Sequence, residues 1–147
     1  MNSTVAIPRA ALGLRLLALL YDLLPLLGLW FLAGVIGVAV TDGTLDPHRF
    51  AHRAMIQILL IVFSASYFVI SWSNGGQTIG MRAWKLRLVT EDGFSLPWPR
   101  ALLRFFLASI SLGALGIGFW WALFDPQRRT IHDIALGTAM RSEPRQK

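Results

Sequence analysis

The feature that most constrains this chain is the apolar stretch from Arg15 to Val40, in which Arg15 and Asp22 are the only formal charges. As a helix, the part after Arg15 covers about 37 Å, enough to cross a hydrocarbon core of about 30 Å with some tilt. A second apolar stretch, residues 55–72, carries no formal charge. We therefore expect two transmembrane helices, over residues 16–40 and 55–72.

A third apolar block, residues 104–124, decides on which side of the membrane the C-terminus lies. If the block is a full span, the 14 basic residues divide equally between the two sides. If it folds back at Gly113–Gly118, the loop after the first span holds only Arg49 and Arg53, and the other 12 lie together. Because cytoplasmic loops carry the excess of Lys and Arg, we favour a re-entrant helical hairpin over a full third span, with both chain ends cytoplasmic.

We expect residues 77–100 to form a water-facing cytoplasmic module. Trp84 to Leu88 alternates apolar and basic side chains, as a half-buried strand does. A turn at Glu91-Asp92-Gly93 allows Phe94–Leu96 to return as a second strand, so we expect a small β-hairpin here.

The predicted fold class is thus an all-α membrane protein with two transmembrane helices, a third apolar block and a small cytoplasmic β-hairpin. We assign residues 1–11 to a flexible head, residues 12–140 to the membrane domain and residues 141–147 to a disordered tail. The small size of the membrane domain favours assembly as a homo-oligomer or with a partner membrane protein.

Composition narrows the classes of function. The chain has no cysteine, which excludes a disulfide framework, a thiolate metal site and a thiol nucleophile. Its net charge of +6 comes from basic residues that flank the apolar blocks, which indicates contact with anionic lipid headgroups rather than nucleic acid. Motifs such as H-E-x-x-H, the phosphate loop and G-x-S-x-G are missing from the sequence, so we expect no enzymatic activity, cofactor or metal site.

Asp22 is the residue that most needs explanation, because a carboxylate deep in a membrane costs roughly 2.5–3.5 kcal/mol unless a partner reduces that cost. We favour a fold-defining ion pair with Arg82 or Arg104, in a structural or accessory membrane module. A second cluster crowds four charged or titratable side chains near the C-terminus, and we interpret it as structural ion pairing rather than a hydrolytic site. Its members are Arg128, Arg129, His132 and Asp133.

The alternative is that Asp22 is an ion or proton site in a transport or exchange protein. Pro25 lacks an N–H and so frees the carbonyl of Tyr21, which lies beside Asp22. Hydroxyls of Ser64 and Tyr67 on the second helix are further candidate ligands. A chain this small cannot enclose a pathway alone, so this alternative requires an oligomer.

These residues resemble the RDD family of membrane proteins, which is named for one arginine and two aspartates. Arg15 and Asp22, in RLLALLYDLLPL, match the arginine at the start of the first helix and the aspartate in its middle. The stretches NGGQTIGMRAWKLRLVTEDG and FDPQRRTIHDIALGT resemble the family's other recurring segments, and the second places the remaining aspartate at Asp133 rather than Asp125.

The resemblance covers residues 10–140 and implies an integral membrane protein of uncharacterised activity, for which transport of unspecified ligands has been suggested. We expect it in a bacterial cytoplasmic membrane with the N-terminus cytoplasmic.

Overall fold

The computed structural model describes residues 10–114, 116–126 and 129–142. Its elements, in chain order, are α1 (Leu12–Val40), α2 (Phe50–Ser73), α3 (Ile79–Ala83), β1 (Leu86–Thr90), α4 (Trp98–Gly113), α5 (Ile117–Phe124), α6 (Ile131–Leu136) and β2 (Thr138–Ser142).

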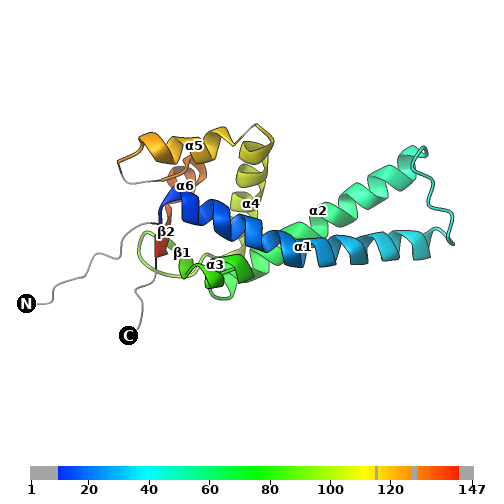
Figure 1. Ribbon diagram of the computed structural model, residues 1–147, viewed down its shortest axis with the longest axis horizontal. Coiled ribbons are helices and arrows are strands. Elements are labelled where there is room, and N and C mark those ends of the chain that lie inside the picture. Colours follow the sequence, from blue (N-terminus) through cyan, green and yellow to red (C-terminus); the bar gives the residue numbers. More distant parts are fainter. Residues whose placement is uncertain (1–9, 115, 127–128, 143–147) are drawn as a thin grey trace, which may run out of the picture.

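Two long apolar helices, α1 and α2, pack side by side and extend together beyond the rest of the molecule (Figure 1). Both are long and apolar enough to cross a membrane, as predicted. The buried residues of α1 recur on one face of the helix, as Ala18, Asp22 and Leu26 illustrate, while Phe31 is 76% exposed. Exposed apolar surface of this extent fits helices whose outer faces contact lipid.

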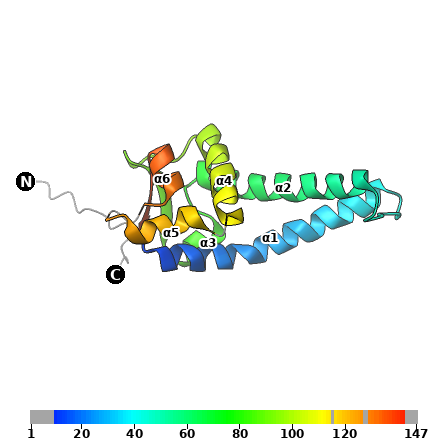
Figure 2. The ribbon, with the colours of Figure 1, turned by 90° about the horizontal axis from the view of Figure 1, so that it is seen from above.

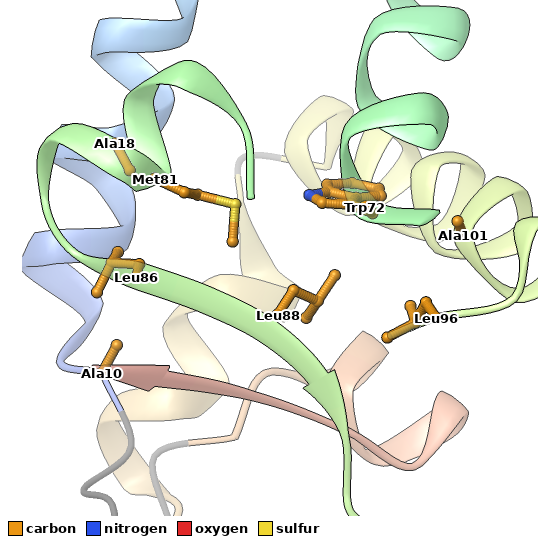
Figure 3. Close-up of a cluster of buried hydrophobic side chains, with 8 residues drawn as sticks. All are labelled: Ala10, Ala18, Trp72, Met81, Leu86, Leu88, Leu96 and Ala101. Atoms are coloured by element: carbon orange, nitrogen blue, oxygen red, sulfur yellow. The ribbon is translucent and has the colours of Figure 1, made fainter. Parts of the chain in front are cut away.

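The other elements form a compact end around the start of α1 and the end of α2 (Figures 1 and 2). We use "compact end" for α3 to α6 together with both strands. Its core consists of small and large apolar side chains from the start of α1, the end of α2 and the segments that follow (Figure 3). They are Ala10, Ala18, Trp72, Met81, Leu86, Leu88, Leu96 and Ala101. Burial of Leu86 and Leu88 in this core holds β1 beside α3 and ties it to the start of α1 and the end of α2.

The sheet differs from our prediction of a β-hairpin. β1 pairs antiparallel with β2, from Leu86 opposite Ser142 to Thr90 opposite Thr138. The hairpin is wrong because Thr90 and Phe94 close a tight turn through mutual hydrogen bonds, after which the chain continues into α4. The free edge of β1 is then available to the C-terminal segment.

Both ends of the described chain therefore belong to the compact end. Ala10, which we placed in the flexible head, is 1% exposed and its N–H donates to the carbonyl of Met140 at 2.9 Å. Arg141 and Ser142, which we placed in the disordered tail, lie in β2. Ala11 is the N-cap residue of α1, and the other residues of that head and tail, 1–9 and 143–147, lie outside the described residues.

The third apolar block is broken near the predicted glycines. α4 ends at Gly113 and α5 starts after Gly116, whose φ of 74° lies in the left-handed region that glycine adopts without strain. α4 runs across the direction of α1 and α2. After it, α5 runs roughly parallel to the long helices, toward α6 (Figures 1 and 2). The two helices therefore form a corner, with α4 not aligned with the spans.

Candidate functional site: two buried charge clusters

Asp22 is 2% exposed and accepts three hydrogen bonds from neutral groups. Its Oδ1 accepts from the Tyr67 hydroxyl and from the Gly80 backbone N–H, each at 2.7 Å. Its Oδ2 accepts from the Thr78 hydroxyl at 2.6 Å. These bonds supply the partners that a buried carboxylate needs.

The donors around Asp22 converge at the start of α3. Thr78 is the N-cap of that helix, because its hydroxyl oxygen accepts from the N–H of Met81 while the hydroxyl donates to Asp22. In the same way the Tyr67 hydroxyl accepts from the N–H of Ile79 at 3.2 Å. Three successive N–H groups of α3 thus reach Asp22 directly or through one hydroxyl, which satisfies donors that the helix itself leaves unpaired.

Close packing of α3 on α1 depends on Gly80. A Cβ atom at this position would overlap the carbonyl oxygen of Ala18 and lie 2.9 Å from the carboxyl carbon of Asp22. Only a glycine lets the N–H of residue 80 approach the carboxylate without a shift of one helix.

The second cluster is built on Asp133, which bridges two buried arginines. Arg15 Nη1 donates to Asp133 Oδ2 at 2.6 Å, and Arg104 Nη2 donates to Oδ1 at 2.7 Å. All three side chains are at most 3% exposed. The cluster therefore joins α1, α4 and α6 through charge-assisted hydrogen bonds.

Two threonines complete this cluster. Thr130 and Asp133 form a capping box at the start of α6, in which each side chain accepts from the other's backbone N–H. Arg104 Nη1 also donates to the Thr138 hydroxyl at 2.6 Å, which adds β2 to the elements joined. Both carboxylate oxygens of Asp133 are thus hydrogen-bonded, as burial of charge requires, while Arg104 uses two of its five N–H groups in these bonds.

The charges set the protonation states of the neighbouring groups. Burial alone raises the pKa of Asp133, but Arg104 and Arg15 outweigh it and hold that pKa well below its usual range. Burial, helped by the positive charge of Arg104, lowers the pKa of His132 to about 3, so this imidazole is neutral at physiological pH. His132 therefore adds no third positive charge to the cluster.

A cavity of about 120 Å³ lies between the two clusters. Asp22 contributes to its wall, as do Arg15, Arg104 and His132, and the rest of the lining is mainly apolar. The cluster around Asp22 and the cluster around Asp133 therefore border the same cavity.

The predicted site residues divide between these clusters and other positions. Of the two hydroxyls named as candidate ligands, that of Tyr67 donates to Asp22, whereas that of Ser64 donates to the Leu60 carbonyl and accepts from the Trp30 indole. The Tyr21 side chain is 50% exposed, and α1 continues through Pro25 without interruption.

The basic residues proposed as ion-pair partners also separate. Arg104 pairs with Asp133, the Arg82 side chain is exposed, and Arg129 pairs with Asp125 at 2.9 Å. Arg128 lies outside the described residues. Within the described chain, Asp22 has no ion pair with any of them, which corrects the partner that we expected. The physical reason is that the start of α3 already supplies the donors.

Sequence reasoning missed four groups: Thr78, Gly80, Thr130 and Thr138. The signal for Thr78 and Thr130 was available, since each threonine precedes a short helix as an N-cap. No local pattern indicates that Gly80 lies against α1 or that Thr138 meets Arg104, because both depend on segments distant in sequence. In the described part of the chain, no group of three or more His, Cys, Asp or Glu side chains is placed to hold a metal ion.

Two exposed apolar helices that are long enough to cross a membrane support a membrane protein. The model of the RDD family matches residues 9–137, and the chain belongs to that family. Arg15, Asp22 and Asp133, which carried the resemblance, are the centres of the two clusters. No curated protein and no solved structure matches the chain significantly.

Proposed function

We propose that this protein is a structural or accessory membrane module in which the three family-defining residues build the compact end. The observation that carries the proposal is that Asp133 bridges Arg15 and Arg104, while Asp22 is satisfied by neutral donors. Both arrangements connect segments far apart in the chain, and neither leaves a carboxylate open to solvent. A structural role in holding the fold together is therefore enough to account for the contacts of these three residues.

The depth of Asp22 supports the same proposal. From Leu23 to Val40 the helix rises about 27 Å, close to the thickness of a hydrocarbon core of about 30 Å. Asp22 then lies near one edge of the core, beside the compact end. Ion sites of transporters lie near the midplane instead, where discontinuous helices meet.

The alternative function is ion or proton exchange with Asp22 as the site, in an oligomer. It is favoured by one observation, which is that Asp22 borders the 120 Å³ cavity. The two functions predict different behaviour for the same substitution.

Asp22→Asn separates them. The amide keeps one acceptor oxygen but sets an N–H₂ group against donors, and a buried group without its partner costs about 1–3 kcal/mol. We expect a lower melting temperature and lower abundance in the membrane, with no Asp22-dependent flux of protons or Na⁺ in reconstituted vesicles. Thr78→Val, which removes one donor, is expected to act in the same direction. Loss of flux at an unchanged melting temperature would favour exchange.

We propose further that the third apolar block stays on one side of the membrane, so that both chain ends are cytoplasmic. α4 and α5 have 16 and 8 residues, fewer than the roughly 20 that a spanning helix needs. Exposed apolar side chains on both helices, among them Ile110, Trp120 and Phe124, suit contact with the acyl region of one leaflet. Pairing of Arg15 with Asp133 supports the same side for the start of α1 and the tail.

Labelling of single cysteines tests this topology, because the natural chain has no cysteine. His48→Cys lies in the loop between α1 and α2, and Asp92→Cys lies in the turn after β1, both at exposed positions. In intact cells we expect an impermeant thiol reagent to label His48→Cys and to spare Asp92→Cys until the membrane is opened. A fluorescent reporter fused after Lys147 should be active in the cytoplasm. The reverse labelling pattern would contradict the proposed orientation.

A further inference from the structure

An apolar groove between α1, α2 and α4 adjoins the charged cavity. The groove has a volume of about 500 Å³, within the usual range of ligand pockets, and is lined by α1, α2 and α4. On α1 it runs from Leu16 to Trp30, which is about 21 Å of helix. One leaflet of the hydrocarbon core is about 15 Å thick, so the groove is long enough for an acyl chain.

The groove and the cavity share part of their walls. Leu19, Phe68, Phe105, Ser109 and Leu112 line both. A molecule with an apolar tail and a polar head can therefore occupy both spaces at once. The groove alone would accept any apolar molecule, whereas the cavity adds polar groups that can bind a polar head.

The cavity presents hydrogen-bond donors that the described residues do not use. Trp72 is 8% exposed, and its Nε1–H has no acceptor among the described residues. Figure 3 shows this nitrogen on the edge of the ring that faces Met81, which is also part of the cavity wall. Arg104 donates through its two terminal nitrogens, and a guanidinium has five N–H groups, so further donors remain beside the Trp72 ring. Buried donors of this kind require an acceptor.

We infer that a glycerophospholipid binds here, with one acyl chain in the groove and a phosphate oxygen accepting from Trp72 and Arg104. Phosphate is the preferred partner of an arginine that offers several donors. The head of such a lipid would lie at the compact end and its tail along α1. A lipid of the leaflet on the side of the compact end has this same orientation, with its head toward that side and its tail toward the middle of the membrane. This assignment goes beyond the proposed structural role and does not depend on it.

Ser109→Phe tests the tail part of the site. Ser109 is exposed and lies where groove and cavity meet, so a phenyl group there fills the junction without entering the core. Leu103→Phe is the matched control, because Leu103 is an exposed residue of the same helix outside both linings. Each protein is purified in mild detergent from membranes supplied with a phospholipid that carries a photoreactive group in mid-chain. Cross-linked peptides and retained lipid are then measured by mass spectrometry.

We expect wild type and Leu103→Phe to retain phospholipid and to cross-link in the segments of α1 and α2 that line the groove. In Ser109→Phe, retained phospholipid and cross-linked peptides should both fall at least about fivefold. A fivefold loss of affinity corresponds to about 1 kcal/mol of binding free energy. Trp72→Phe keeps an aromatic side chain but removes the indole N–H together with part of the ring volume, so it should lower phospholipid retention about fivefold while mid-chain cross-links, where they form, stay in the same segments.

Four results would overturn the assignment. The first is absence of retained and cross-linked phospholipid in the wild type, and the second is equal retention in Ser109→Phe and wild type. The third is that cysteines placed in the groove cross-link two chains efficiently, because a second copy would then cover the groove. The fourth is unchanged retention in Trp72→Phe, which would remove the phosphate contact and with it the proposed head position.

Discussion

Asp133→Asn is expected to lower the free energy of unfolding by about 3–5 kcal/mol, the cost of removing one partner from a buried ion pair. The substitution keeps the size of the side chain but leaves Arg15 and Arg104 buried without a carboxylate between them. It also replaces one of two oxygens that are both in use, since Oδ2 accepts from Arg15 and the Thr130 N–H and Oδ1 accepts from Arg104. Thermal unfolding in detergent, followed by circular dichroism, measures the effect.

Asp125→Asn is the matched control, because it makes the same chemical change in the same chain. Asp125 pairs with Arg129 within one turn of chain, and that arginine is reachable by solvent. We expect a clearly smaller decrease in melting temperature than for Asp133→Asn. Equal decreases would mean that the bridge between the two arginines has no special weight.

Gly80→Ala is expected to be the second most damaging substitution. The added methyl group would overlap the backbone carbonyl of Ala18, and backbone cannot move as a flexible side chain can. Overpacking costs about 1–3 kcal/mol, and displacement of α3 would also weaken the hydrogen bond from residue 80 to Asp22. We expect a melting temperature below that of wild type and lower abundance in the membrane.

Gly28→Ala provides the control for this substitution. A Cβ atom at Gly28 would have no atom within 4 Å other than its own chain neighbours and helix backbone. It should therefore melt at or above the wild-type temperature, since alanine is the better helix former. A stable Gly80→Ala protein with an unchanged melting temperature would show that α3 does not pack tightly on α1.

The long-range features of this fold were predictable only where composition decides them. Residues 16–40 and 55–72 were assigned to membrane helices because a sustained apolar stretch has few alternatives, and α1 and α2 contain both ranges. The break in the third block was predictable from its glycines for a similar reason, since Gly116 adopts a positive φ.

Pairing between distant segments was not predictable in the same way. A local turn after β1 suggested a hairpin, but β1 pairs with a strand that lies about fifty residues later. The partner of a strand depends on tertiary contacts, here the burial of Leu86 and Leu88 against the core.

The partners of the charged residues show the same limit. The sequence indicated that Asp22 needs a partner, but a basic residue and the start of a short helix satisfy a carboxylate equally well in principle. Arg104 was a candidate for Asp22, and its pairing with Asp133 instead follows from how α4 and α6 pack at the compact end. Family resemblance identified the three important residues without indicating which of them touch.

The claim that Asp133 holds the compact end together is tested most directly by a double-mutant cycle between Arg15 and Asp133, residues 118 positions apart in the chain. The free energy of unfolding is measured for wild type, Arg15→Gln, Asp133→Asn and the double variant. We predict that the double variant loses at least about 1 kcal/mol less than the two single losses together, because each single variant already breaks the pair. Single losses that add to within about 0.5 kcal/mol would contradict the account.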